Sequence, residues 1–113
     1  TLVECSDCHL AYPPAFLPQR SWEVILSNLS NHYRINANLD DAATWEIYDY
    51  LMANAPLHLD GVSPETTPLR ITELPWFTEV HGPSIVKDAR SNREIGRISN
   101  CTGCHFNAVN GVF

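Results

Sequence analysis

The sequence of 113 residues has little positive charge and no long apolar run. Seven lysines and arginines stand against 13 aspartates and glutamates, which gives a formal net charge of -6 at pH 7. This balance argues against nucleic acid and anionic membrane surfaces as partners and favours a protein with a basic surface. No segment is predicted to span a membrane, because no stretch of about 18 consecutive apolar residues occurs.

Sulfur-containing residues are also few. The chain has one methionine and four cysteines, and all four cysteines fall in two short motifs, Cys5-Ser6-Asp7-Cys8 and Cys101-Thr102-Gly103-Cys104. No cysteine is left over for a disulfide framework. A chain of this length forms one domain by size, or two small lobes that share a core.

A histidine follows each cysteine pair at once, His9 in the first motif and His105 in the second. Cys-x-x-Cys-His is the attachment signature of a c-type haem. Each thiol adds to one vinyl group of the porphyrin, and the histidine gives the iron its fifth ligand. The sequence therefore predicts two covalent haem c groups, with His9 and His105 as iron ligands and with Cys5, Cys8, Cys101 and Cys104 as attachment points.

Two Cys-x-x-Cys pairs could instead form a four-cysteine zinc site, or either pair could be a redox dithiol. Zinc ribbons usually keep their pairs about 12 to 20 residues apart, whereas these pairs lie at the two ends of the chain. A histidine directly after both second cysteines would rarely arise by chance. The motifs therefore favour haem.

His32 is a candidate for the sixth ligand of one iron. Ser21 is predicted to cap a helix from Trp22 to about Tyr33, which places His32 on an apolar face. A histidine in such a stripe is usually a core residue, but an iron that needs a sixth ligand favours ligation. The predicted face consists of Trp22, Ile25, Leu26, Leu29, His32 and Tyr33.

His81 is the corresponding candidate in the second half of the chain. Thr72 is predicted to cap a short helix in which Leu74, Phe77 and His81 share a face. Gly82-Pro83 then ends the helix directly after the histidine, where a side chain can be aimed sharply. From the residues alone, His32 and His81 could each serve either haem.

Two further residues are weaker candidates for iron ligation. Met52, the single methionine, lies in a second predicted helix that begins at Asp40 or Asp41 and runs to about Ala55 before Pro56. We interpret Met52 as part of the buried face of that helix and His58 as a loop or surface histidine. The predicted buried face consists of Trp45, Tyr48, Leu51, Met52 and Ala55.

The rest of the chain defines the predicted organisation. We expect a first haem lobe at 1–56, a connecting loop at 57–70 and a second haem lobe at 71–113, all within one compact unit that shares a core. Residues 84–100 hold scattered aliphatics and four of the seven basic residues, which indicate a solvated face; stabilisation of haem propionates or partner docking are the alternatives. Asn110-Gly111 predicts a final turn.

Taken in order, these elements resemble the small dihaem cytochrome c family, often called DHC. The resemblance rests on both haem motifs, the Trp22-Glu23 helix leading to His32, the helix from Trp45 to Leu51 and the Trp76-Phe77 element leading to His81. It covers nearly the whole chain. It implies a mainly α fold with much irregular structure, in which the N-terminal half is like a reduced monohaem cytochrome c and the C-terminal half is largely loop.

The resemblance also implies ligand pairs and partners. It pairs His9 with His32 on the first haem and His105 with His81 on the second. It implies a periplasmic electron carrier that passes electrons to a small oxygen-binding monohaem cytochrome c and takes them from a membrane b-type cytochrome.

The chemistry of the candidate ligands leads to the same function. Two imidazoles leave no open position on an iron, so we predict an electron carrier, not an enzyme, with both potentials below those of His/Met cytochromes. The alternatives are a haem enzyme or a gas or ligand sensor with one open or labile iron, and an interaction subunit of a redox complex. Because covalent haem attachment takes place outside the bacterial cytoplasm and the chain begins at Thr1, we expect a periplasmic protein whose signal peptide has been removed.

Overall fold

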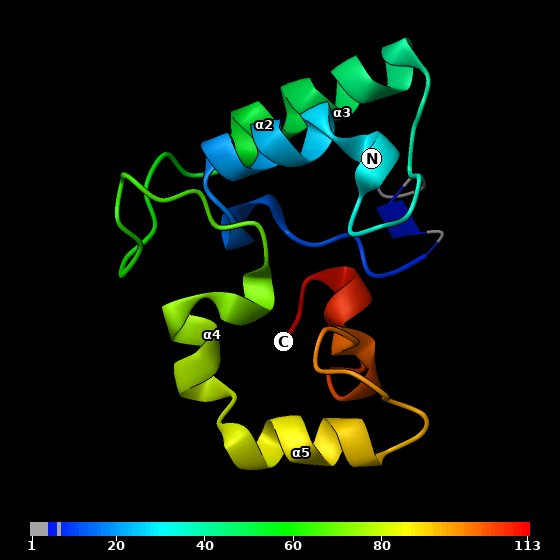
Figure 1. Ribbon diagram of the computed structural model, residues 1–113, viewed down its shortest axis with the longest axis vertical. Helices are drawn as coiled ribbons and strands as arrows, with labels where there is room; N and C mark the ends of the chain where they lie inside the picture. Colours follow the sequence, from blue (N-terminus) through cyan, green and yellow to red (C-terminus); the bar gives the residue numbers. More distant parts are fainter. Residues whose placement is uncertain (1–4, 7) are drawn as a thin grey trace. The chain divides into compact units, whose positions relative to one another are not determined.

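The structure is a computed structural model that describes residues 5, 6 and 8–113. This part of the chain contains helices joined by loops and no strand (Figure 1). The prediction of a mainly α fold with much irregular structure is confirmed. The α-helices are α2 (Gln19–Ser27), α3 (Asp41–Asn54), α4 (Pro75–Val80) and α5 (Pro83–Ser91), and the 3-10 helices are η1 (Pro14–Phe16), η2 (Leu29–Asn31), η3 (Ile71–Glu73), η4 (Cys101–Gly103) and η5 (Ala108–Asn110).

The chain divides into two compact units. Unit 1 is Pro14–Ile71, and unit 2 combines the described residues before Pro14 with Thr72–Phe113. Both Cys-x-x-Cys-His motifs therefore belong to unit 2, together with His81, whereas His32 belongs to unit 1. The haem lobes at 1–56 and 71–113 stay a prediction about which segments enclose each haem.

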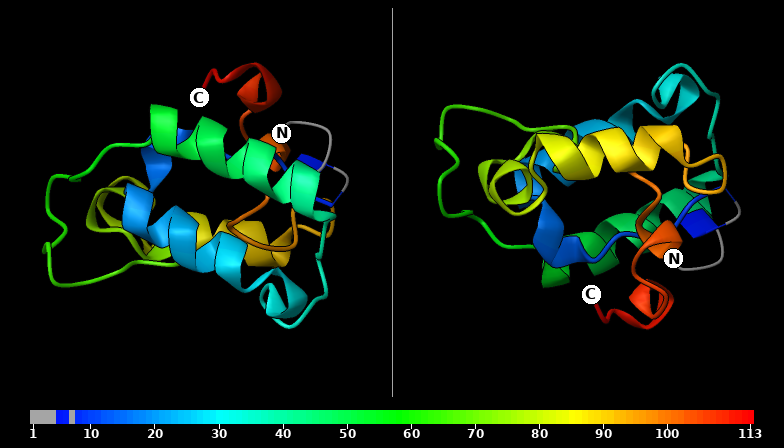
Figure 2. Two further views of the ribbon diagram at one scale, coloured as in Figure 1. Left: turned by 90° about the horizontal axis from the view of Figure 1, so that it is seen from above. Right: turned by 90° about the horizontal axis from the view of Figure 1, so that it is seen from below.

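Unit 1 is built on α2 and α3, which run side by side in both views of Figure 2. The buried apolar residues of this unit come from these two helices and from the segments next to them. The Trp22 indole Nε1 donates to the Pro14 carbonyl, at 3.0 Å, so the polar edge of this buried ring is satisfied. The core consists of Leu17, Trp22, Ile47, Leu51 and Ala55.

The prediction for α2 is wrong at both ends. Pro18 is the N-cap, in extended conformation, and the helix begins at Gln19, so Ser21 lies inside the first turn and is fully buried. The helix ends at Ser27, well before His32, and a separate 3-10 turn follows. The apolar spacing continues past Ser27 although the backbone has left the α-helix, and this continuation produced the overlong prediction.

The prediction for α3 is confirmed in its bounds. The Asp40 side chain accepts a hydrogen bond from the Ala43 backbone N–H, at 2.7 Å, and Ala55 ends the helix before Pro56. Its predicted buried face is partly wrong. Ile47, Leu51 and Ala55, spaced four residues apart, are buried, whereas Trp45 is 64% exposed.

The connecting segment at 57–70 contains no helix, as predicted, and the short η3 follows it. One side chain from α2 binds it at three points. Arg20 donates from Nε to the Thr66 carbonyl at 2.6 Å, from one terminal nitrogen to Ser63 at 3.0 Å and from the other to Leu57 at 3.3 Å. The loop is therefore tied to α2 by a guanidinium fork.

Unit 2 contains α4 and α5, which follow one another around the corner formed by His81 and Gly82 (Figure 1). The predicted short helix is present, but its N-cap is Leu74 with Pro75 at the first position, and Thr72 lies in η3. Helix α5 is absent from the prediction: Gly82-Pro83 predicts only the end of the preceding helix, whereas proline also favours the first position of a helix. Gly111, with φ at 77°, confirms the final turn. The core consists of Leu74, Phe77, Ala89 and Ala108.

Candidate haem sites

The second motif is wound into a tight turn by its own backbone. The amides of Cys104 and His105 both donate to the Cys101 carbonyl, at 3.2 and 2.7 Å. The turn packs closely on its surroundings at Gly103, where a Cβ would meet the Ile95 side chain at 3.1 Å, tighter than an ordinary van der Waals contact. The turn therefore presents both cysteines and the histidine within one short, closely packed loop.

The two thiols of this motif differ in environment. Cys104 is exposed, whereas Cys101 is half-buried and its Sγ donates to the Ser99 carbonyl at 3.6 Å. Burial raises the pKa of the Cys101 thiol above its ordinary value, so the sulfur is held in the protonated form at neutral pH.

The candidate ligands His81 and His105 are brought together within unit 2. Their ring centroids are 6.2 Å apart, with an angle of 68° between the ring planes. Two imidazoles on opposite sides of one metal ion have centroids roughly 6.3 Å apart, because each metal–nitrogen bond is about 2.0 to 2.1 Å long. The centroid spacing of these two rings is close to that value.

The ring of His81 is oriented by the last turn of α4. His81 is the C-cap residue, and its Nδ1 lies 3.1 Å from the Phe77 carbonyl oxygen. The Phe77 ring stacks on the imidazole at 4.0 Å and 11°. With the proton on Nδ1 donated to this carbonyl, Nε2 keeps the lone pair that a metal needs.

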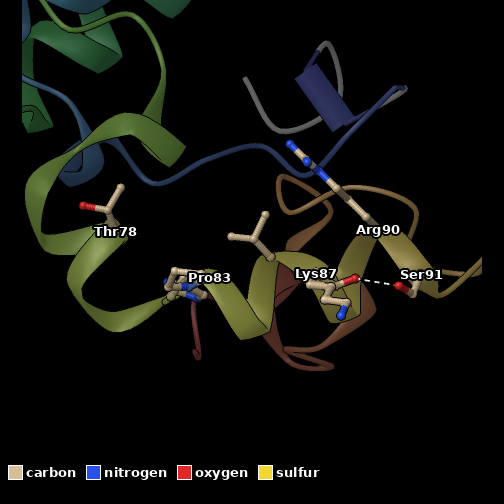
Figure 3. Close-up of a pocket in the computed structure, with 7 residues that line it drawn as sticks. Thr78, Pro83, Lys87, Arg90 and Ser91 are labelled. Carbon is tan, nitrogen blue, oxygen red and sulfur yellow. Dashed lines mark hydrogen bonds between the residues drawn. The ribbon is translucent and has the colours of Figure 1, made fainter.

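A pocket of about 510 Å³ lies beside His81 (Figure 3). Two basic residues of α5, Lys87 and Arg90, contribute to its wall and leave the helix in different directions. The remaining lining residues are Thr78, Pro83, Val86 and Ser91. On the other histidine, Phe113 packs edge-on against the His105 ring at 5.5 Å. Aromatic rings therefore contact both imidazoles, and positively charged side chains line the pocket beside His81.

The first motif is held through its histidine. His9 Nδ1 lies 2.6 Å from the Leu10 carbonyl oxygen, and the ring stacks on Tyr12 at 5.0 Å and 24°. The Tyr12 hydroxyl donates to the Ser99 carbonyl at 3.0 Å, just before the second motif. As for His81, a carbonyl at Nδ1 leaves Nε2 for a metal. Cys5 is half-buried and Cys8 is exposed.

His32 lies in unit 1 at the end of η2, where it is the C-cap residue. It lines a pocket of about 290 Å³ together with Tyr33, Leu69 and Arg70. The weaker candidates have other surroundings: His58 is exposed in the loop, and Met52 lies within α3, where its carbonyl accepts from Gln19.

The described residues do not form the four-cysteine zinc site that was the alternative to haem. Among residues 5, 6 and 8–113, which include all four cysteines, no three histidine, cysteine or acidic side chains form a group that could hold a metal ion. The described helices also include none long and apolar enough to cross a membrane.

A helical fold with two Cys-x-x-Cys-His motifs defines a c-type cytochrome with two haems. The sequence model of the family described as dihaem cytochrome c, DHC, matches residues 1–113. The chain belongs to this family of electron-transfer cytochromes, which carry two haem c groups and exchange electrons with other redox proteins.

Solved structures agree with this assignment. A dihaem cytochrome c from Rhodobacter sphaeroides is 41% identical, with a TM-score of 0.85, over 99% of this chain and 93% of that chain. A dihaem cytochrome c from Shewanella baltica is 35% identical, with a TM-score of 0.83, over 99% and 83% of the two chains. A search of the curated proteins finds no match. The resemblance inferred from the sequence is confirmed.

The sequence did not reveal which side chains orient the histidines. Tyr12 and Phe77 stack on His9 and His81, and both are aromatic residues three or four positions from the histidine they contact. For Phe77 and His81 that spacing is a usable signal, because residues at i and i+4 meet on a helix, whereas His9 and Tyr12 lie outside any helix.

Proposed function

We propose that this cytochrome is a periplasmic electron carrier in which two histidines bind each haem iron. The first haem is attached to Cys5 and Cys8, with His9 and His32 as iron ligands; the second is attached to Cys101 and Cys104, with His105 and His81 as iron ligands. The observation that carries the proposal is the 6.2 Å spacing of the His81 and His105 rings. This spacing favours the uncrossed pairing and leaves His32 for the first haem.

Haem iron supplies one-electron chemistry by cycling between ferric and ferrous states. Residues of the chain orient the proposed histidine ligands. The Phe77 and Leu10 carbonyls fix the Nδ1 protons of His81 and His9, so each ring presents Nε2 in a set orientation. With two imidazoles on each iron, no position is open to substrate, and this arrangement favours a carrier over an enzyme.

The same ligands set the direction of the reduction potentials. Replacing a thioether ligand by an imidazole favours ferric iron and lowers the potential. We therefore expect both haems to have potentials below those of His/Met cytochromes, and different from each other because His9 stacks on Tyr12 whereas His81 stacks on Phe77. A redox titration that places either haem well above 0 mV would contradict this.

The proposed partners are a small oxygen-binding monohaem cytochrome c as acceptor and a membrane b-type cytochrome as donor. Charge supports a basic partner surface, because the chain carries a net charge of -6. On α3, the exposed ring of Trp45 lies between Asp41 and Asp49 at four-residue spacing, and Glu46 is also exposed. Acidic side chains around an exposed aromatic ring suit a brief electrostatic encounter with a basic protein.

Low-temperature electron paramagnetic resonance on the oxidised protein tests the ligation. We expect only low-spin bis-histidine signals in the wild type, and we expect His32→Met and His81→Met each to change the signal of one haem. A high-spin ferric signal in the wild type would mean one open iron and would favour a haem enzyme or a gas sensor.

Carbon monoxide added to the reduced wild type gives an independent readout. A six-coordinate ferrous haem leaves its Soret band unshifted on mixing, whereas an open or labile site shifts at once. A prompt shift would therefore contradict the carrier proposal.

A further inference from the structure

His32 is followed by a tight left-handed turn. The amide of His32 donates to the Ile35 carbonyl at 2.8 Å, and the Ile35 amide donates back to the His32 carbonyl at 3.0 Å. The two residues between them have positive φ, 51° at Tyr33 and 74° at Arg34. Positive φ at both central residues is the pattern of a type I′ turn.

Tyr33 and Arg34 are unusual residues for a type I′ turn. Type I′ turns strongly prefer Asn-Gly or another glycine pair, because a Cβ crowds the backbone when φ is positive. Tyr33 and Arg34 both carry long side chains. Such a conformation persists only where surrounding contacts hold it, and it is found most often at functional sites.

The contacts that hold the turn come from the segment before η3. The Tyr33 hydroxyl donates to the Leu69 carbonyl. The guanidinium carbon of Arg70 lies 4.7 Å from the centroid of the Tyr33 ring, in a cation–π contact. Leu69 therefore holds the hydroxyl of Tyr33, and Arg70 contacts the face of its ring.

The fixed tyrosine in turn contacts the histidine. The rings of His32 and Tyr33 meet edge to face, with centroids 4.7 Å apart and an interplanar angle of 74°. All four residues, His32, Tyr33, Leu69 and Arg70, line the same pocket of unit 1. Movement of Tyr33 would therefore move both the backbone and the ring of His32.

We propose that Tyr33 and Arg70 are positioning residues that hold His32 on the iron of the first haem. Tyr33, pinned to Leu69 and Arg70, keeps the strained turn closed and so slows the departure of the histidine from the iron. This inference rests on the proposed ligation by His32. It goes beyond that ligation because it assigns the retention of the ligand to two residues that do not touch the metal.

The rate of carbon monoxide binding to the reduced holoprotein measures ligand retention. At saturating carbon monoxide, the rate for a six-coordinate haem is limited by dissociation of its histidine. The phase that belongs to the first haem is the one that His32→Ala makes fast. We expect Tyr33→Phe, which removes one hydrogen bond and keeps the ring, to raise the limiting rate of this phase about fivefold, the factor that one typical net hydrogen bond provides.

Two further variants separate positioning from general loss of structure. Arg70→Gln removes the cation from the ring and should also raise the limiting rate, whereas Arg70→Lys should restore part of the slow rate. Tyr50→Phe removes a hydroxyl from a tyrosine of α3 that is 44% exposed, close to the 40% of Tyr33, and should leave the rate unchanged.

The outcomes distinguish the inference from the function on which it rests. If His32→Ala changes the phase while Tyr33→Phe and Arg70→Gln leave it at the wild-type rate, the positioning role is overturned and the ligand stands. If His32→Ala alters no phase, His32 is not a ligand and both proposals fail. If Tyr50→Phe accelerates the phase as much as Tyr33→Phe, the effect is not specific to the turn and the inference is overturned.

Discussion

Replacing Arg20 by alanine should destabilise the protein measurably, because this one side chain ties the 57–70 segment to α2. The guanidinium donates to the carbonyls of Thr66, Ser63 and Leu57 at 2.6, 3.0 and 3.3 Å. Alanine would remove all three donors and leave the carbonyls to water. The same loop leads to the segment that holds Tyr33.

The size of the effect follows from the three bonds and their exposure. A net hydrogen bond contributes about 0.5 to 1.5 kcal/mol, and these bonds lie at the surface, so we take the lower half of that range. The sum is about 2 kcal/mol. In a domain of this size, about 1 kcal/mol shifts the midpoint of thermal unfolding by roughly 4 °C, so the midpoint should fall by about 8 °C.

The assay is thermal unfolding of the holoprotein followed by far-ultraviolet circular dichroism. Arg20→Lys should recover about a third of the loss, because an ammonium cannot reach three carbonyls that a fork spans. Arg93→Ala, a change at an exposed arginine of unit 2, is the matched control and should leave the midpoint within about 1 °C. A fall of less than about 2 °C for Arg20→Ala, or full recovery by lysine, would refute the reasoning.

Three further predictions concern the core, the second haem and the pH response. Ile47 of α3 is only 2% exposed, so Ile47→Ala should lower the free energy of unfolding by about 2 to 4 kcal/mol and Ile47→Val by about 1 kcal/mol in denaturant titrations. Arg90 lines the pocket beside His81, so Arg90→Gln should lower the potential of the second haem, because loss of a nearby positive charge favours ferric iron; a redox titration with both potentials unchanged would contradict this. The hydroxyl of Tyr48 donates to Glu23 at 2.9 Å, and this bond raises the pKa of the tyrosine. Its contribution to stability is therefore present below the ordinary pKa of 10.0 and is lost as pH rises through the higher folded value. Alkaline absorbance titration should show one late-titrating tyrosine in the wild type, and Glu23→Ala, which removes both the acceptor and the charge, should make it titrate earlier.

Local signals decided which helices could be predicted from the sequence. Helix α3 was predictable because both of its ends are set by adjacent residues, the Asp40 side chain at the start and Pro56 after the end. Helix α5 was missed because Pro83 can stop one helix and begin the next, and only the backbone around Gly82 distinguishes the two. The apolar spacing through His32 was correct as a pattern, but the same spacing is compatible with an α-helix followed by a 3-10 turn.

The haem motifs are local in the same sense. Cys5 to His9 and Cys101 to His105 carry the attachment chemistry in five consecutive residues each, so the two cofactors followed from the sequence without a fold. The sixth ligands are not local, since each needs a histidine that the fold delivers from elsewhere in the chain. The contacts between Phe77 and His81 and between Tyr33 and Arg70 depend on backbone geometry that no periodicity specifies.

Both proposed sixth ligands occupy the same kind of backbone position. His32 is the C-cap residue of η2 and His81 is the C-cap residue of α4. At this position the chain has left the helix, while the carbonyls of the last turn are still within reach of the imidazole. The Phe77 carbonyl accepts hydrogen bonds from the backbone N–H and the Nδ1–H of His81, and the second bond makes Nε2 a stronger donor to the proposed iron. A stronger donor favours the ferric state. The end of α4 therefore orients His81 and, through the same hydrogen bond, lowers the expected reduction potential of the second haem.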